Sequence, residues 1–292
     1  MPTSDRVSVL IPAYNEESSI GNLIEALVSL NAWHEVVVVD DGSSDHTAEV
    51  AEQAGARVIR HPYNKGNGAA VKTAVRSCRG EFLLLMDADG QHDPADIEAF
   101  VSKLDQYDLV VGARSFSQQA SFSRGLGNKL LNQFASMLVE FPIKDLTSGF
   151  RAARRDKFME FVHLLPNGFS YPTTSTLAFV RAGYNVLFIP IAGKQRQTQS
   201  TSKMRPWREG WRFVMIILRM VTLFSPLRIF FPMALVFFLI GAGYMAYTIA
   251  TEVHVTNTSV LLITGAAVLF LFGLLSEQVA ALRFERLDQK GD

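Results

Sequence analysis

Two apolar runs in the sequence end directly in pairs of carboxylates. The run VVVV leads into Asp40 and Asp41, and the run LLLM leads into Asp87, Ala88 and Asp89. If both runs are strands of an open α/β sheet, their carboxyl ends form the ligand crevice, so the four acids should converge on one cleft. Clustered carboxylates repel and raise one another's pKa unless a cation or hydrogen-bond donors offset their charge. The pattern therefore predicts a binding site.

The spacing of Asp87, Asp89 and Gln91 favours a metal site. In an extended segment these alternate side chains lie on the same side. Oxygen ligands suit Mg²⁺ or Mn²⁺, which take a carboxylate or two and fill their other positions with water and substrate phosphates. Asp-x-Asp is also common in loops and helix caps. The apolar strand before it and the second acidic strand end favour the metal interpretation, while scattered histidines and a single cysteine disfavour zinc.

A glycine-rich segment, PYNKGNGAA at 62–70, is a third candidate. It places Asn64, Lys65, Gly66 and Gly68 just before an expected helix, where the backbone could approach a nucleotide closely. The segment matches neither GxxxxGK[ST] nor GxGxxG. An ordinary turn at a helix start is the alternative interpretation.

These segments need a sheet to position them. Apolar runs alternate with helical patterns over residues 1–202, which predicts an α/β domain with a mainly parallel, Rossmann-like sheet. Strands are expected at 7–11, 35–39, 56–60, 81–86, 108–113 and 184–191. Ser44 or Asp45 is expected to begin one helix, and Asp93 followed by Pro94 another.

The C-terminal part of the chain is apolar. Residues 229–251 and 253–276 contain no charged residue, and a spanning helix needs about 20 apolar residues. We expect transmembrane helices at 229–251 and 257–279 and a tail at 280–292, with a pair of buried core helices as the alternative. Lys and Arg flank the pair on the outside and are absent from its tip, which predicts that both termini are cytoplasmic.

The overall charge is balanced, with 28 basic and 28 acidic residues, and gives no indication of nucleic-acid binding. Residues 203–228, however, contain six basic residues and one acidic residue. Between Pro206 and Pro226, arginines share one side of a helical projection and tryptophans another, which predicts an interfacial membrane helix. A helix packed on the domain is the alternative.

Cys78, the one cysteine, excludes an intrachain disulfide, and no signal-peptide pattern is visible.

Eight short motifs occur in order between residues 7 and 209. They are VLIPAYNE (9–16), VVDDGSSD (38–45), NKGNGAA (64–70), MDADGQH (86–92), VVGAR (110–114), RGLGNK (124–129), DLTSGFR (145–151) and STSKMRPWRE (200–209). With the apolar segments that follow, this series resembles the family 2 inverting glycosyltransferases of GT-A fold, of the type that synthesises polyprenyl-phosphate (dolichyl- or undecaprenyl-phosphate) sugars.

The resemblance implies a role for each matching residue. Nucleotide binding is implied for Pro12, Ala13, Tyr14, Glu16, Asp40, Asp41, Gly68, Asp87 and Ala88. Asp89 and Gln91 would hold Mg²⁺ or Mn²⁺ on the donor diphosphate. The acceptor phosphate would be bound by Arg114, Arg124 and Lys129, and the active-site loop would contain Ser202, Lys203 and Arg205. The implied catalytic residues are Asp87, Asp89, Arg114 and Arg124. Without the resemblance, the residue type alone would favour a different interpretation of Arg114, as a solvent-exposed charge at the end of a strand.

The implied reaction is inverting transfer of a hexose, such as glucose or mannose, from a UDP- or GDP-sugar to a polyprenyl phosphate. The expected location is the cytoplasmic face of a bacterial inner membrane, and a homo-oligomer such as a tetramer is expected. Two segments depart from the family pattern. The glycine that the family commonly has is missing from RQTQSTSK at 196–203, and an acidic residue is missing from GFSYPTTSTL. The identity of the transferred sugar is therefore not predicted. The alternatives are a processive polysaccharide synthase, whose QxxRW motif is not matched at 195–199, and a non-catalytic membrane-anchored sugar-nucleotide-binding protein.

Overall fold

The computed structural model describes residues 6–30, 32–90, 96–114, 122–168, 170–191 and 224–288, together with residues 215, 218 and 219. Within these ranges the side chains of 122–126 and 283–288 are not described. The chain divides into two compact units. The first comprises Met1–Met137 and Phe141–Glu209, and the second comprises Leu138–Glu140 and Gly210–Asp292.

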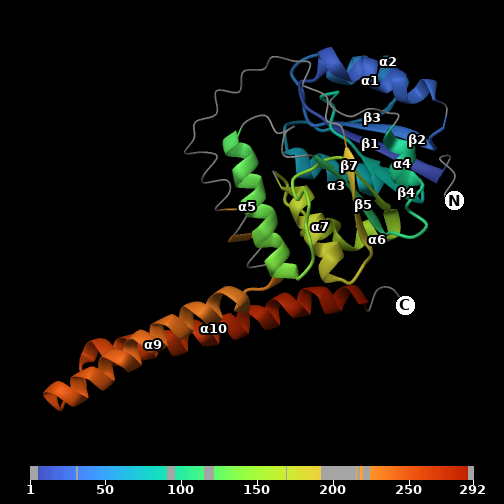
Figure 1. Cartoon of the computed structure of the whole chain (residues 1–292). Coiled ribbons are helices and arrows are strands. Elements are labelled where there is room, and N and C mark those ends of the chain that lie inside the picture. Colours follow the sequence, from blue (N-terminus) through green and yellow to red (C-terminus); the bar gives the residue numbers. More distant parts are fainter. Residues whose placement is uncertain are drawn as a thin grey trace. The chain divides into compact units, whose positions relative to one another are not determined.

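A seven-stranded sheet forms the centre of the first unit (Figure 1). Its strands are β1 (Val7–Ala13), β2 (Glu35–Asp40), β3 (Arg57–Arg60), β4 (Phe82–Leu85), β5 (Leu109–Arg114), β6 (Arg151–Arg154) and β7 (Val186–Ile191). Their spatial order is β3-β2-β1-β4-β6-β5-β7. Only β6 runs antiparallel to its neighbours, β4 and β5, while the other pairs are parallel. This arrangement confirms the predicted mainly parallel α/β fold and adds one strand, β6, that the sequence analysis did not predict.

Helices cover both faces of this sheet (Figure 1). The helices between residues 17 and 181 are α1 (Glu17–Ser29), α2 (Thr47–Gln53), α3 (Asn67–Ser77), α4 (Ile97–Val101), α5 (Phe122–Val139), α6 (Arg155–Phe161), the 3₁₀ helix η4 (Val162–Leu164) and α7 (Tyr171–Arg181). Helix α2 begins two residues after Asp45, whose Oδ1 accepts the Thr47 N–H at 3.1 Å. The helix expected after Pro94 is α4, which begins at Ile97, and residues 91–95 lie outside the described ranges.

The alternation of side chains along the strands shows which face of the sheet carries the core. Val9 and Ile11 of β1 point to one face, where they belong to the same buried cluster as Ile20 and Ile24 of α1. The register pairs Ala13 with Asp40 across β1 and β2, and β4 lies directly on the other side of β1. The carboxyl ends of β1, β2 and β4 are therefore neighbours at the middle of the sheet.

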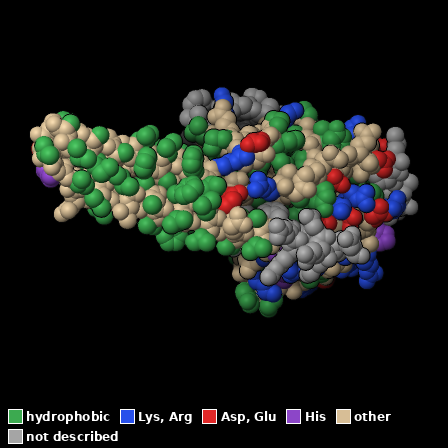
Figure 2. Space-filling model, turned by 90° about the horizontal axis from the view of Figure 1, so that it is seen from below, with side chains coloured by type: hydrophobic (Ala, Val, Ile, Leu, Met, Phe, Trp, Pro, Cys, Tyr) green, Lys and Arg blue, Asp and Glu red, His purple; other side chains and the backbone are tan. Residues whose placement is uncertain are grey.

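The second unit contains two long apolar helices, α9 (Leu227–Glu252) and α10 (Asn257–Asp288), which run side by side (Figure 1). Their most apolar windows have mean hydropathies of 2.1 and 2.3, so both helices are long and apolar enough to cross a membrane. Figure 2 shows hydrophobic side chains over much of their surface. The expected spans, 229–251 and 257–279, fall inside these helices. Of the predicted interfacial segment, 203–228, the structure describes only residues 215, 218, 219 and 224–228, so the prediction of an interfacial helix lies mostly outside the described residues.

The contacts between α9 and α10 include two near the start of α9. Gly273 lies against Phe230, and a Cβ at Gly273 would be 2.7 Å from the Phe230 Cβ. The Glu277 carboxylate of α10 accepts the backbone N–H of Leu227, the first residue of α9, at 3.1 Å. The carboxylate therefore satisfies one of the N–H groups that a helix start leaves without an intrahelical partner.

Candidate active site

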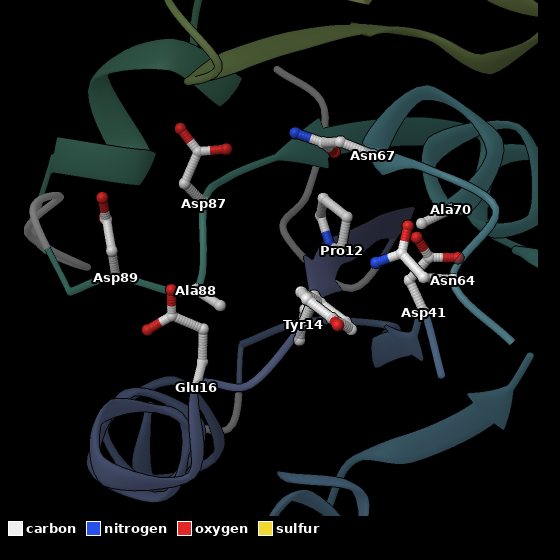
Figure 3. Close-up of a pocket in the computed structure, with 11 residues that line it drawn as sticks. Pro12, Tyr14, Glu16, Asp41, Asn64, Asn67, Ala70, Asp87, Ala88 and Asp89 are labelled. Atoms are coloured by element: carbon white, nitrogen blue, oxygen red, sulfur yellow. The ribbon is translucent and has the colours of Figure 1, made fainter. Parts of the chain in front are cut away.

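A cavity of about 370 Å³ opens at the carboxyl ends of β1, β2 and β4 (Figure 3). Eight of the residues that line it are predicted from the sequence: Pro12, Ala13, Tyr14, Glu16, Asp41, Asp87, Ala88 and Asp89. The other three lining residues belong to the glycine-rich candidate segment at 62–70: Asn64, which was named there, Asn67 and Ala70. Figure 3 shows the carboxylates of Glu16, Asp87 and Asp89 toward one end of the cavity and Asp41 and Asn64 toward the other. The acids at two strand ends thus meet in one pocket, as the strand pattern indicated.

Asp87 packs directly against the backbone of Gly149. A Cβ at residue 149 would lie 2.5 Å from the Asp87 Oδ2, so only glycine permits this close approach. Arg151 and Tyr171 are fully buried close enough for the charge of Asp87 to act on both. Burial lowers the pKa of Arg151, and the charges of Asp145 and Asp87 oppose that effect. Burial together with the charge of Asp87 raises the pKa of Tyr171.

The start of α1 is tied to the segment that joins the two aspartates. The Ser19 hydroxyl lies 2.9 Å from the carbonyl oxygen of Ala88 and 3.1 Å from Oε2 of Glu16. This contact holds the backbone between Asp87 and Asp89 against α1.

The oxygen donors of this pocket fit a hard divalent cation. Among the residues that the structure describes, no three His, Cys, Asp or Glu side chains gather into a metal-binding group, and the predicted ligand Gln91 lies outside them. Mg²⁺ is held through one or two carboxylates when substrate phosphates and water supply the other ligands. Asp87 and Asp89 match that donor set.

Arg114, at the end of β5, is fixed along one edge of its guanidinium. Its Nε donates to Oδ2 of Asp145 at 2.9 Å, and its Nη2 donates to the Thr147 hydroxyl at 2.9 Å. Burial alone would lower the pKa of Arg114. The hydrogen bond and charge of Asp145, with the charges of Asp87 and Asp89, raise the pKa above its usual value. Arg114 is therefore a held cation close to the acids of the pocket.

Two residues predicted to bind the nucleotide do not line the pocket. The Asp40 carboxylate accepts the N–H of Ser43 at 3.1 Å and its hydroxyl. The Gly68 N–H donates to the carbonyl of Gly168 at 3.1 Å, and a Cβ at residue 68 would overlap the carbonyl oxygen of Pro166. Both residues shape the site from outside the cavity.

The structure describes the other predicted residues only in part. Lys129 is exposed on α5, and Arg124 lies in α5 with its side chain outside the described set. The predicted metal ligand Gln91 and the predicted loop residues Ser202, Lys203 and Arg205 also lie outside the described residues.

Several residues around the pocket have no assigned role in the sequence analysis. Asp145, Thr147, Gly149 and Arg151 all belong to DLTSGFR, one of the eight motifs that the chain shares with the family it resembles. The signal was therefore present, since an acid, a hydroxyl, a glycine and an arginine in seven residues indicate a polar site. Their roles depend on contacts with β4, β5 and α7, which local sequence does not reveal.

An α/β domain with an acidic pocket at the carboxyl edge of a mainly parallel sheet is the architecture of a GT-A enzyme. Residues 8–162 match the family model described as glycosyl transferase family 2. Residues 225–282 match a second model, the GtrB C-terminal hairpin. The first match covers more than half of the chain, so the chain belongs to glycosyl transferase family 2 and is a glycosyltransferase.

Two relatives indicate which branch of the family this chain resembles. Glycosyltransferase AglJ of Haloferax volcanii is 28% identical over 300 residues, which cover 98% of each chain. An undecaprenyl-phosphate 4-deoxy-4-formamido-L-arabinose transferase of Pseudomonas fluorescens is 31% identical over 222 residues, which cover 69% of this chain and 61% of the relative. The chain is thus related to polyprenyl-phosphate sugar transferases.

A solved structure supports the fold. The glucosyl-3-phosphoglycerate synthase of Mycobacterium tuberculosis, in complex with Mn²⁺, UDP and glucosyl-3-phosphoglycerate, has a TM-score of 0.60 and 22% identity. The similarity covers 74% of this chain and 78% of the synthase. It shows that the two proteins share the GT-A fold.

Proposed function

We propose that this glycosyltransferase transfers a hexose from a UDP- or GDP-sugar to a polyprenyl phosphate, with inversion at the anomeric carbon. The observation that carries the proposal is the fixed Arg114 cation beside a pocket that contains Asp87 and Asp89. Carboxylates suit a metal-bound diphosphate, and a guanidinium suits a second phosphate. The name of the Pseudomonas fluorescens relative includes undecaprenyl phosphate, and the mycobacterial synthase was solved with Mn²⁺ and UDP, which supports the same assignment.

On the donor side, the nucleotide is bound by the pocket wall that Pro12, Ala13, Tyr14 and Glu16 begin. Asp41 and Ala88 continue this wall, and Asp87 faces the donor. Asp89 and Gln91 would hold Mg²⁺ or Mn²⁺ together with the donor diphosphate. When bound, such an ion would supply Lewis-acid stabilisation of the departing nucleoside diphosphate.

On the acceptor side, Arg114, Arg124 and Lys129 bind the lipid phosphate. A phosphate monoester has a second pKa of about 6 and is already anionic at neutral pH, so attack needs no proton-abstracting base. Planar guanidinium groups offset the charge of the phosphate and aim one of its oxygens. Attack opposite the leaving group inverts the anomeric carbon, giving a β-linked product from an α-linked donor.

The rest of the chain places this reaction at a membrane. We infer that residues 229–251 and 257–279 span it, that residues 203–228 lie at its surface, and that the catalytic domain 1–202 and both termini are cytoplasmic. A bacterial inner membrane and a homo-oligomer, such as a tetramer, complete the proposal. The active-site loop with Ser202, Lys203 and Arg205 closes over the bound substrates.

The proposal is tested with radiolabelled UDP- and GDP-sugars supplied to the purified chain together with undecaprenyl or dolichyl phosphate. We expect label in the lipid fraction, its loss with EDTA, and its recovery with added Mn²⁺ or Mg²⁺. Absence of labelled lipid with every common donor would overturn the proposed reaction.

The Asp89→Ala variant tests the metal site within the same assay. Because a metal contributes several kcal/mol of charge stabilisation, we expect kcat to fall about a hundredfold or more. Asp105→Ala, an exposed aspartate after α4, is the matched control and should keep wild-type activity. Equal rates for Asp89→Ala and the control would remove Asp89 from the mechanism.

A further inference from the structure

A buried histidine lies behind the pocket wall. His61 follows β3 and is 7% exposed. Its Nδ1 is 2.6 Å from Oδ1 of Asp41, and its Nε2 is 2.9 Å from the hydroxyl of Thr73 in α3. Asp41 lines the cavity, whereas His61 and Thr73 do not. The histidine therefore lies one contact away from the cavity.

The carboxylate of Asp41 also holds the loop that precedes α3. Its Oδ1 accepts the N–H of Lys65 at 3.0 Å, and its Oδ2 accepts the N–H of Gly66 at 2.7 Å. The residues on either side of these two amides, Asn64 and Asn67, line the pocket. Asp41 is thus an anchor for the pocket wall that these asparagines form.

The proton on Nδ1 of His61 follows from its partner. A carboxylate only accepts hydrogen bonds, so Nδ1 of His61 donates to Asp41. The other ring nitrogen, Nε2, shares a hydrogen bond with the Thr73 hydroxyl. The result is one chain of hydrogen bonds from Thr73 through His61 to Asp41, which in turn accepts from the loop amides.

We propose that His61 is a positioning residue for nucleotide binding, which fixes the Asp41 carboxylate and, through it, the pocket wall at residues 64–67. The inference rests on the proposed function, because it takes the cavity as the nucleotide site. Loss of the His61 donor leaves the carboxylate of Asp41, which is 2% exposed, with an unfilled acceptor position.

The opposite end of the loop is held independently. The N–H groups of Gly68 and Ala69 donate to the carbonyls of Gly168 and Asn167 at 3.1 and 2.8 Å. The Lys72 ammonium also donates to the Leu165 carbonyl at 3.1 Å. Loss of the His61 contact should therefore displace residues 64–67 while α3 stays in place.

Two substitutions of His61 separate its two contacts. In His61→Asn the side-chain amide nitrogen takes the place of Nδ1, so the bond to Asp41 is kept and the bond to Thr73 is lost. In His61→Gln the longer side chain takes the place of Nε2, so the bond to Thr73 is kept and the bond to Asp41 is lost. His34→Gln, at an exposed histidine before β2, is the matched control.

Nucleotide affinity is the main measurement, by calorimetry with UDP and GDP in the presence of Mn²⁺ on the full chain. We expect His61→Gln to weaken binding about tenfold, the equivalent of roughly 1.4 kcal/mol. His61→Asn should remain within about threefold of wild type, and His34→Gln should be unchanged. In steady-state assays the donor KM should rise with little change in kcat, a split that general destabilisation does not produce.

Hydrogen exchange of the peptide that spans 61–70 reports the loop directly and requires no ligand. We expect faster exchange in His61→Gln than in His61→Asn, with α3 beyond residue 70 unchanged. A folded His61→Gln with wild-type affinity and wild-type exchange overturns the inference. If wild type binds neither nucleotide, the proposed function fails, while the exchange comparison still decides whether His61 fixes the loop.

A second pair of variants covers the case in which His61→Gln does not fold. Thr73→Ser keeps the hydroxyl that is hydrogen-bonded to Nε2 of His61, and Thr73→Val removes it with little change in shape. We expect Thr73→Val to bind nucleotide about threefold more weakly than Thr73→Ser, since one hydrogen bond to the histidine is lost. Equal affinities of the two variants contradict the positioning role.

Discussion

Arg114 is a cation held at the edge of an acidic pocket by a buried acid. Asp145 is 2% exposed, and two of its oxygens face the same guanidinium. A carboxylate that is removed from water needs such charged or hydrogen-bonding partners, so the pair is mutually dependent. Because Asp145 and Thr147 occupy the Nε and Nη2 edge of the guanidinium, its direction is fixed before any substrate binds.

The Asp145→Asn variant tests this arrangement. In this variant the side chain at residue 145 keeps one oxygen acceptor but loses the negative charge. Its NH2 group replaces the other oxygen and is a donor facing the donors of Arg114. We therefore expect the guanidinium to turn away from residue 145. The Arg114 side chain is 30% exposed, and water offsets part of the loss. We therefore expect the KM for polyprenyl phosphate to rise about tenfold, roughly 1.4 kcal/mol, with a smaller change in the donor KM. Steady-state kinetics at saturating donor measure both.

Asp156→Asn provides the control for this substitution. Asp156 pairs with Arg154 at 3.4 Å, and the two side chains are 57% and 39% exposed, so this ion pair contributes little. The variant should keep wild-type kinetics. An unchanged acceptor KM in a folded Asp145→Asn protein would show that Arg114 needs no anchor.

The residue types around the pocket were predictable, and their partners were not. Asp40 and Asp41 were both predicted to face the cleft because both follow an apolar run. Neighbouring side chains at the end of a strand point to opposite sides, and only Asp41 lines the cavity. Asp41 in turn is anchored by His61, twenty residues along the chain. A motif identifies a polar residue, whereas its hydrogen-bond partners depend on how distant strands are paired.

At the level of elements, the buried parallel strands could be predicted from the sequence, because strands that are covered on both faces consist of continuous apolar runs. Strand β6 has no such signal, since its four residues RAAR are charged at both ends. It forms because β4 and β5 leave a gap that its backbone fills with hydrogen bonds on both sides. Arg151 is accommodated there by neutral oxygens of α7, including the Pro172 carbonyl at 3.0 Å and the Ser175 hydroxyl at 2.6 Å.

The apolar hairpin contains a helix cap supplied by its partner helix. Pro226 precedes α9 and has no side-chain oxygen that could accept a helix N–H, and Glu277 of α10 accepts the Leu227 N–H instead. A carboxylate at a helix N-terminus also interacts favourably with the helix dipole. We expect Glu277→Ala to lower the free energy of unfolding by about 1 kcal/mol. Thermal unfolding in detergent, followed by circular dichroism, measures the change.

Two further variants make the Glu277 prediction specific. Glu277→Gln keeps an oxygen acceptor and should lose less stability than Glu277→Ala. Glu252→Ala removes an exposed carboxylate at the last residue of α9 and should leave the melting temperature unchanged. Equal melting temperatures for Glu277→Ala and Glu252→Ala would contradict the capping role.

For the whole molecule, the single cysteine allows the proposed membrane topology to be tested without altering the background. Cys78 is 2% exposed, and burial raises the pKa of its thiol, although the charge of Arg155 opposes this effect. The reactive thiolate is therefore scarce at neutral pH, and the folded wild-type chain should not react with a membrane-impermeant maleimide. Any labelling of a variant then reports the introduced cysteine.

Val255→Cys lies in the exposed connection between α9 and α10, and Lys103→Cys lies on the exposed surface of the first unit. If the positive charges that flank the hairpin keep both of its ends in the cytoplasm, the connection is on the opposite side of the membrane. We expect impermeant maleimide to label Val255→Cys in intact spheroplasts and Lys103→Cys only after the membrane is opened. Labelling of both variants in intact spheroplasts would place the catalytic domain outside the membrane, where a cytoplasmic sugar nucleotide cannot reach it. Labelling of neither variant would argue against a hairpin that spans the membrane.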